Sequence, residues 1–272
     1  MRSLQDGFST SYLVSREAVA AYHRDGHVSL RDVADRQTVE RFAPAIRRTA
    51  LAHVRETRPL RERDTYGRAF LQVGSLRLMD GECATFVTAQ RFAEVAARLM
   101  GVDGVRVYND QALFKEPGGG HTPWHQDQVY WPLDTDSMIT MWMPLVDVSE
   151  DMGSMSFVSG SFRYGDLGPL VISDASQDAY EAWIRDHHRA VATHGALRAG
   201  DATFHAGWTL HSAPANPTSV VREVMTVIYF ADGARLLEPT TASRANDLRL
   251  LFPGQAPGDL PHDTLHPLVY KA

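Results

Sequence analysis

A histidine and an aspartate stand two positions apart in the segment Pro123-Trp-His-Gln-Asp-Gln-Val-Tyr-Trp131. On a β-strand, residues i and i+2 project to the same face, so the side chains of His125 and Asp127 can reach one metal ion. A second histidine, His211, lies far downstream. Two histidines and one carboxylate on one face of a ferrous ion leave open the positions that an oxygen-activating site needs. These three residues therefore predict an Fe(II) centre that uses O2 as co-substrate.

Two histidines, His205 and His211, compete for the third ligand position. We favour His211, because it leads into a Pro- and Asn-containing turn and then to Arg222 on the next predicted strand. His205 is then expected to support the site or to pack beside it. A guanidinium binds a carboxylate through two parallel hydrogen bonds, and 2-oxoglutarate ends in such a carboxylate. Each part of this pattern also has a simpler interpretation. His125 and Asp127 could lie at the end of a strand without binding metal, and Arg222 could be an edge-strand residue that faces water.

The elements that must position these residues change in character along the chain. Residues 15–58 read as helical, with a serine N-cap at Ser15, a glycine stop at Gly26 and a second helix opening at Asp35. A short strand is expected at 28–30, a loop at 59–68, a strand within 69–79 and a helix at 89–100. Further on, short apolar runs alternate with Gly, Pro and Asp, which indicates a sandwich or barrel. These runs are 105–115, 123–131, 137–146, 155–158, 196–204, 207–211 and 223–231.

We therefore expect one domain over residues 1–272, with a helical N-terminal part at about 15–100 and a β core at about 104–232. A helical insertion at about 164–192 interrupts the core, and it could be a lid over the site or a surface packing element. The tail, 239–272, carries Pro253, Pro257, Pro261 and Pro267 and is expected to be loop-rich. Oligomeric state is not predicted.

The composition excludes several partners. A net charge of −6 and a pI near 6.0 favour neither nucleic acid nor an anionic membrane. No apolar run approaches the roughly 20 residues that a membrane span needs. The single cysteine, Cys83, allows no internal disulfide, and no signal peptide is recognised at the N-terminus, so a cytoplasmic location is expected.

The pattern His125-Gln-Asp127, His211, Asn216 and Arg222 resembles the phytanoyl-CoA dioxygenase-like (PhyH) family of iron(II)/2-oxoglutarate oxygenases. The resemblance extends to the segments Tyr22-His-Arg-Asp-Gly26-His-Val, Phe114-Lys-Glu-Pro-Gly118 and Gly153-Ser-Met-Ser-Phe-Val-Ser-Gly160. It implies a mainly β fold with flanking helices around a double-stranded β-helix (jelly-roll, cupin-like) core. It makes the triad the iron ligands, and it makes Arg222 the partner of the distal carboxylate of 2-oxoglutarate. It also places Gln111 and Trp142 as further cofactor contacts; otherwise they are a polar strand residue and a core tryptophan.

Two details refine the expected reaction. Where many relatives read Pro-Gly-Ser-His, this chain has Ser159-Gly-Ser-Phe162, which removes a histidine from the pocket wall. Halogenases of the family lack the carboxylate so that chloride can bind, and the presence of Asp127 therefore argues against halogenation. Hydroxylation is the main expectation, with epimerisation, ring closure and desaturation as alternatives.

The substrate is expected to be a small natural product of polyketide or terpenoid type. Only two lysines are present, so no clamp for the diphosphate of CoA is evident. The arginine-rich composition is typical of GC-rich bacteria, in which similar enzymes often serve antibiotic biosynthesis. Aromatic residues that flank the motifs are candidates for the pocket wall or else for the core: Tyr66, Phe70, Tyr130, Trp131 and Trp208.

Two other classes fit parts of the pattern. The triad could hold zinc and activate water for a non-oxidative reaction, although that chemistry has no use for Arg222. Alternatively, the jelly-roll could bind metal without turnover, which an intact ligand set argues against.

Overall fold

The N-terminal helices begin and end at the expected caps. Our computed structural model describes residues 10–168 and 170–272. Helix α2 (Arg16–Asp25) begins after Ser15, whose side chain accepts a hydrogen bond from the Ala18 amide, and ends at Gly26 with φ +80°. Helix α3 (Arg36–His53) begins after Asp35, and α6 (Gln90–Met100) ends at a left-handed glycine. Within the described ranges, no helix combines the length and the apolar character that crossing a membrane requires.

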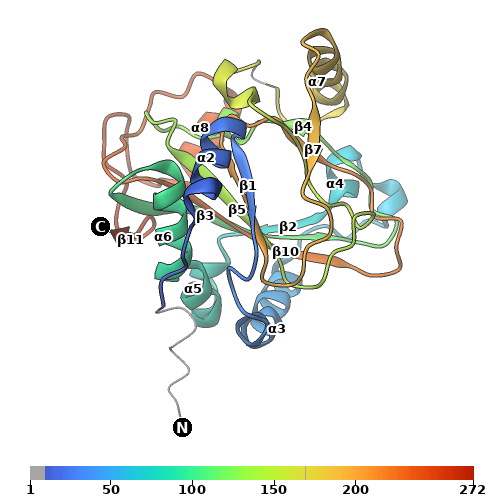
Figure 1. Cartoon of the computed structure of the whole chain (residues 1–272), viewed down its shortest axis with the longest axis horizontal. Helices are drawn as coiled ribbons and strands as arrows, with labels where there is room; N and C mark the ends of the chain where they lie inside the picture. Colours follow the sequence, from blue (N-terminus) through green and yellow to red (C-terminus); the bar gives the residue numbers. More distant parts are fainter. Residues whose placement is uncertain (1–9, 169) are drawn as a thin grey trace.

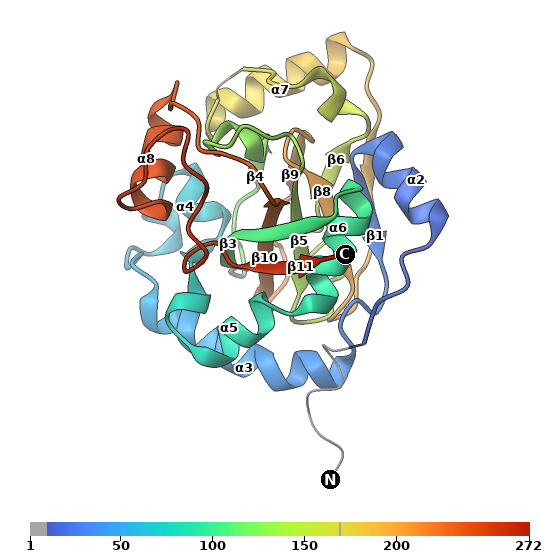
Figure 2. The same ribbon diagram turned by 90° about the vertical axis from the view of Figure 1, so that its left-hand side faces the viewer.

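Two antiparallel sheets form the core (Figures 1 and 2). The larger sheet, as far as the chain is described, has the order β1-β8-β5-β10-β3-β11, and β2 also pairs with β3. Its strands are β1 (His27–Leu30), β2 (Leu71–Gly74), β3 (Gly104–Lys115), β5 (Met138–Pro144), β8 (Ala202–Ala206), β10 (Arg222–Ala231) and β11 (Leu268–Lys271). The smaller sheet has the order β4-β9-β6-β7, built from β4 (Thr122–His125), β6 (Ser156–Val158), β7 (Val191–Thr193) and β9 (His211–Ala213). The mainly β core with flanking helices is thus confirmed, and across residues 10–168 and 170–272 the sheets do not close into a barrel.

Alternate residues divide the larger sheet into two faces, because successive strand residues point to opposite sides. On β10, Met225 and Val227 join the main apolar cluster, to which α3, α5 (Gly81–Val87) and α6 also contribute. Between them, Thr226 points the other way and lines a cavity, as does Thr140 of β5. These three helices therefore cover one face of the sheet, and the cavity lies on the opposite face.

Other elements are short or peripheral. Helix α7 (Asp174–Asp186) lies in the predicted insertion, and its buried Tyr180 packs in a small cluster with Trp124 of β4. Figure 2 shows α7 and α3 at opposite ends of the molecule. The 3-10 helices are η1 (Leu60–Glu62), η2 (Leu76–Leu78), η3 (Asp127–Val129) and η4 (Ser161–Tyr164).

The expected loop and tail contain more structure than the sequence indicated. Residues 59–68 hold η1 and most of α4 (Thr65–Ala69), because Asp64 caps α4 by accepting from the Gly67 amide. The tail holds α8 (Ala242–Leu251) and β11 as well as loops. The prolines come after α8, and Leu248 and Leu251 pack it against the cluster around Tyr108 and Phe252. The N-terminal part also supplies β1 and β2 to the larger sheet.

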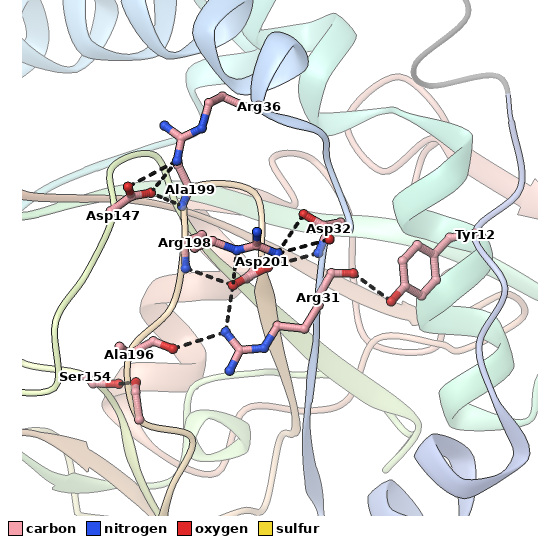
Figure 3. Close-up of polar contacts among 11 residues, drawn as sticks. Tyr12, Arg31, Asp32, Arg36, Asp147, Ser154, Ala196, Arg198, Ala199 and Asp201 are labelled. Carbon is pink, nitrogen blue, oxygen red and sulfur yellow. Dashed lines mark hydrogen bonds and ion pairs between the residues drawn. The ribbon is translucent and has the colours of Figure 1, made fainter.

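A buried carboxylate fixes the start of β8. Asp201 accepts hydrogen bonds from Arg31 Nη1 at 2.8 Å, from the Asp32 amide at 2.9 Å and from the Arg198 amide at 2.8 Å (Figure 3). Arg198 also pairs with the Asp32 carboxylate at 3.1 Å. This network ties the segment after β1 to the strand that carries His205.

Candidate metal and cofactor site

The two predicted histidine ligands lie side by side on neighbouring strands of the smaller sheet. His125 ends β4 and His211 begins β9, where the two residues are register partners with ring centroids 4.1 Å apart. Asp127 follows two residues later, as the first residue of η3 rather than on the strand itself. His125 and Asp127 were expected to project from one face of a single strand. Instead, one lies at the end of a strand and the other in a tight turn, but the three side chains still converge.

Both imidazoles are oriented by the backbone. The Nδ1 atom of His125 lies 2.8 Å from the Pro123 carbonyl oxygen, and that of His211 lies 2.8 Å from the Thr209 carbonyl oxygen. Since a carbonyl only accepts, each Nδ1 carries the hydrogen and each Nε2 offers a lone pair. Burial lowers the pKa of both rings, which keeps them neutral.

The three ligand atoms surround one point. Asp127 Oδ1 lies 3.6 Å from His125 Nε2 and 3.7 Å from His211 Nε2. All candidate ligand atoms of the triad lie within 4.8 Å of one another. These separations are too long for hydrogen bonds, and they suit an ion placed between the atoms with metal–ligand bonds of about 2.1 Å. The donor set therefore fits a divalent transition metal.

The second oxygen of Asp127 is held separately. Thr140 Oγ1 donates to Oδ2 at 2.9 Å, and His205 Nε2 lies 3.2 Å from the same atom. His205 thus does not join the triad but supports its carboxylate, as expected from the sequence. Burial raises the pKa of Asp127, but His211, His205 and His125 together outweigh burial and hold that pKa below its usual range. Asp127 is therefore ionised, as a metal ligand must be.

Arg222 is a buried cation with an incomplete set of partners. Its side chain is almost fully buried, its Nη1 donates to the Gly153 carbonyl at 2.6 Å, and its guanidinium lies 5.3 Å from the centre of the Trp142 ring. Nε has no partner, and within the described residues no carboxylate pairs with this arginine. Burial lowers its pKa to about 9, so the guanidinium is still charged at neutral pH. A buried, unpaired cation favours an anionic ligand.

One cavity of about 670 Å³ contains both the triad and Arg222. Its wall includes most of the predicted cofactor and substrate residues, namely Gln111, Trp142, Tyr66, Phe70, Tyr130 and Trp131. Trp208 is a correction: it does not line the cavity. It lies in the turn after β8, where its indole nitrogen donates to Asp136 Oδ1 at 2.7 Å.

Among the cavity residues that the sequence analysis did not single out, Thr140 and Asp247 carry polar groups that bear on the site. Thr140 looks like any β-branched residue of a strand, and only the register beside Asp127 shows its role. Asp247 of α8 also lines the cavity, from a tail that we expected to be loop-rich. Thr241 was the available sequence signal for α8, because serine and threonine often cap the start of a helix. In the structure its side chain accepts a hydrogen bond from the Arg244 amide.

A two-histidine, one-carboxylate site between the sheets of a double-stranded β-helix is the arrangement of the non-heme iron oxygenases. The model of the phytanoyl-CoA dioxygenase (PhyH) family matches residues 22–224. The chain belongs to this family.

Solved structures and a curated relative agree with this class. The carbocyclase SnoK from nogalamycin biosynthesis is 27% identical, with a TM-score of 0.78 over 94% of this chain and 96% of its own. The epimerase SnoN from the same biosynthesis is 27% identical, with a TM-score of 0.75 over 93% of this chain and 97% of its own. A probable alpha-ketoglutarate-dependent hypophosphite dioxygenase of Stutzerimonas stutzeri is 25% identical over 154 residues, which cover 55% of this chain and about half, 53%, of that relative.

Proposed function

We propose that this protein is an Fe(II)/2-oxoglutarate-dependent oxygenase. His125, Asp127 and His211 bind the iron, and Arg222 binds the distal carboxylate of 2-oxoglutarate. The main support for this proposal is that three converging ligand atoms and an unpaired, buried guanidinium line the same cavity. When bound, iron and 2-oxoglutarate supply activation of O2 coupled to decarboxylation of the oxo acid to succinate. A hydrolytic zinc site would leave Arg222 without a role.

The residues of the chain hold and orient these groups. The backbone carbonyls behind both histidines fix the ring orientations, and Thr140 and His205 leave Asp127 Oδ1 to face the ion. Trp142 packs against the Arg222 guanidinium, and Gln111 lines the cavity from the adjacent strand β3. The aromatic wall limits the water that reaches the reacting carbon.

We propose a small natural product of polyketide or terpenoid type as the substrate, in antibiotic or related secondary metabolism. A cavity of about 670 Å³ is the size of a drug-like ligand site. SnoN has been solved in complex with Fe3+, alpha ketoglutarate and nogalamycin RO. Hydroxylation is the first expectation; because SnoK is a carbocyclase and SnoN an epimerase, ring closure and epimerisation are the alternatives, with desaturation, that product analysis must separate.

The cofactor assignment is tested by anaerobic titration of the apoprotein with Fe(II) and 2-oxoglutarate. We expect the weak visible metal-to-ligand charge-transfer band in the wild type, and its loss in His211→Ala. Arg222→Ala should need far more 2-oxoglutarate for the same band. Tight metal binding without any band in the wild type would contradict the proposal and would favour the zinc-type or silent metal-binding alternatives.

A further inference from the structure

Helix α8 brings a carboxylate to the cavity from outside the region that the family model matches. The family match ends at residue 224, whereas α8 spans Ala242–Leu251. Asp247 of α8 lines the same cavity as the triad. Asp247 is thus separate from the residues proposed to hold iron and 2-oxoglutarate.

Asp247 is held in place but is not neutralised. Tyr108 donates from its hydroxyl to Asp247 Oδ2 at 2.8 Å, and the Tyr108 ring is buried between Trp131 and Phe252, at centroid distances of 5.6 Å and 5.8 Å. Within the described residues, no arginine, lysine or histidine pairs with this carboxylate, and Oδ1 has no hydrogen-bond partner. Burial raises the pKa of Asp247 to about 6, and the Tyr108 hydrogen bond offsets only part of that effect. A half-buried, unpaired carboxylate is costly unless a ligand compensates it.

Aromatic rings accompany this carboxylate along the wall. Tyr66, Tyr130 and Trp131 line the same cavity. Burial raises the pKa of Tyr66 and of Tyr130, and the negative charges of Asp127 and Asp247 act in the same direction. The combination of a carboxylate with aromatic faces is a recognition site for an organic cation.

We propose that Asp247 recognises the substrate by pairing with a protonated amine. The inference rests on the proposed function, which it deepens: the substrate is an amine-bearing, partly apolar molecule that extends from Asp247 along the tyrosines toward the iron ligands. Asp247 Oδ1 accepts from the ammonium group, and the rim side chains Met79 and Leu250, which are exposed, contact apolar parts.

The test uses benzylamine and benzyl alcohol, which differ in charge but little in shape. Each is titrated by calorimetry into the anaerobic holoenzyme loaded with Fe(II) and 2-oxoglutarate. We expect the wild type to bind benzylamine about tenfold or more tightly than benzyl alcohol, as a charge-assisted hydrogen bond in a cavity provides. Asp247→Asn should remove this preference. Asp136→Asn, the same change at an exposed carboxylate outside the cavity, should keep it.

Equal affinity for the two probes, no saturable binding of benzylamine, or an unchanged preference in Asp247→Asn would each overturn the proposal. The charge-transfer band, recorded on the same samples, reports the iron and 2-oxoglutarate site alone. Its absence in the wild type would therefore count against the proposed function, while the amine preference remains a separate result.

Discussion

At the scale of single residues, Thr140 supports a proposed iron ligand without being a ligand itself. Its hydroxyl donates to Asp127 Oδ2 at 2.9 Å and so leaves Oδ1 for the ion. We predict that Thr140→Val weakens Fe(II) binding about 10- to 100-fold, the usual effect of losing such a supporting hydrogen bond. The measurement is an anaerobic Fe(II) titration at saturating 2-oxoglutarate.

A neighbouring threonine provides the matched control. Thr226 of β10 lines the same cavity, but its hydroxyl lies 3.2 Å from the Gln111 carbonyl oxygen and does not contact the triad. Thr226→Val should leave the affinity for Fe(II) nearly unchanged. If both variants weakened iron binding equally, the loss would reflect the cavity as a whole and not the Asp127 contact.

Gly153 positions Arg222 through its carbonyl, and only glycine fits there. Its φ is +78°, and an added Cβ would lie 2.8 Å from the Pro214 carbonyl oxygen and 3.1 Å from Lys115 Cδ. We predict that Gly153→Ala lowers the free energy of unfolding by more than the roughly 1–3 kcal/mol of backbone strain alone. It should also raise the KM for 2-oxoglutarate, because the 2.6 Å hydrogen bond to Arg222 shifts.

A substitution at Gly254 is a control that separates the effect of backbone strain from the effect of the close Cβ contacts at Gly153. It has nearly the same φ, +77°, and an added Cβ would meet no atom within 4 Å. Gly254→Ala should therefore show the strain alone, read by chemical denaturation, with an unchanged KM. If both substitutions changed the KM for 2-oxoglutarate equally, the claim that the Gly153 carbonyl positions Arg222 would be wrong.

At the scale of elements, the sequence predicted those whose signals are local. Ser15 and Asp35 cap their helices as expected, and the apolar runs at 105–115 and 223–231 correspond to β3 and β10. The elements that were missed depend on tertiary contacts. Strand β11 lies in the tail that was expected to be loop-rich and is held there by pairing with β3, and α8 packs through Leu248 and Leu251 although its sequence has little amphipathic pattern.

The same distinction applies to the site. The convergence of His125, Asp127 and His211 followed from residue type and spacing, and the pairing of β4 with β9 supplies the contact that the sequence could only suggest. Asp247 could not be predicted, because an aspartate on an isolated helix is ordinarily solvated. Only the position of α8 against Tyr108 and the cavity gives its carboxylate a role.

Helix α8 also carries a stability cost. The pKa of Asp247 is raised from 3.8 to about 6 by burial, so the folded state disfavours its charge. The contribution of Asp247 to the free energy of unfolding is therefore most favourable below about pH 3.8, where the carboxyl is protonated in both states, and this stability is lost as the pH rises through 6. We predict that Asp247→Asn stabilises the substrate-free protein by about 1–2 kcal/mol at pH 7.5, a value reduced for the solvent that reaches the cavity.

Denaturant titrations of both proteins at several pH values test this. The advantage of Asp247→Asn should shrink between pH 6 and pH 4. An advantage that did not depend on pH, or a destabilised variant at pH 7.5, would mean that the carboxylate is compensated by the fold and not kept for a ligand.

At the scale of the whole molecule, the two sheets share the site. The proposed histidine ligands come from β4 and β9 of the smaller sheet, and Arg222 begins β10 of the larger sheet. In the proposed site, iron held by the triad and 2-oxoglutarate held by Arg222 would connect the two sheets. Since a ligand that binds only the folded state stabilises it, the cofactors should raise the melting temperature of the entire domain.

We predict an anaerobic Tm increase in two separable steps. At a 2-oxoglutarate concentration of about 100 times its Kd, the gain of about 2.7 kcal/mol corresponds to roughly 5–10 °C for a domain of this size, in addition to the gain from Fe(II). Arg222→Ala should keep the Fe(II) step and lose most of the 2-oxoglutarate step, whereas His211→Ala should lose both. Differential scanning calorimetry would contradict this connection between the sheets if 2-oxoglutarate raised the Tm equally in Arg222→Ala and in the wild type. That result would mean that the oxo acid is held at the metal alone and that the buried charge of Arg222 serves another anion.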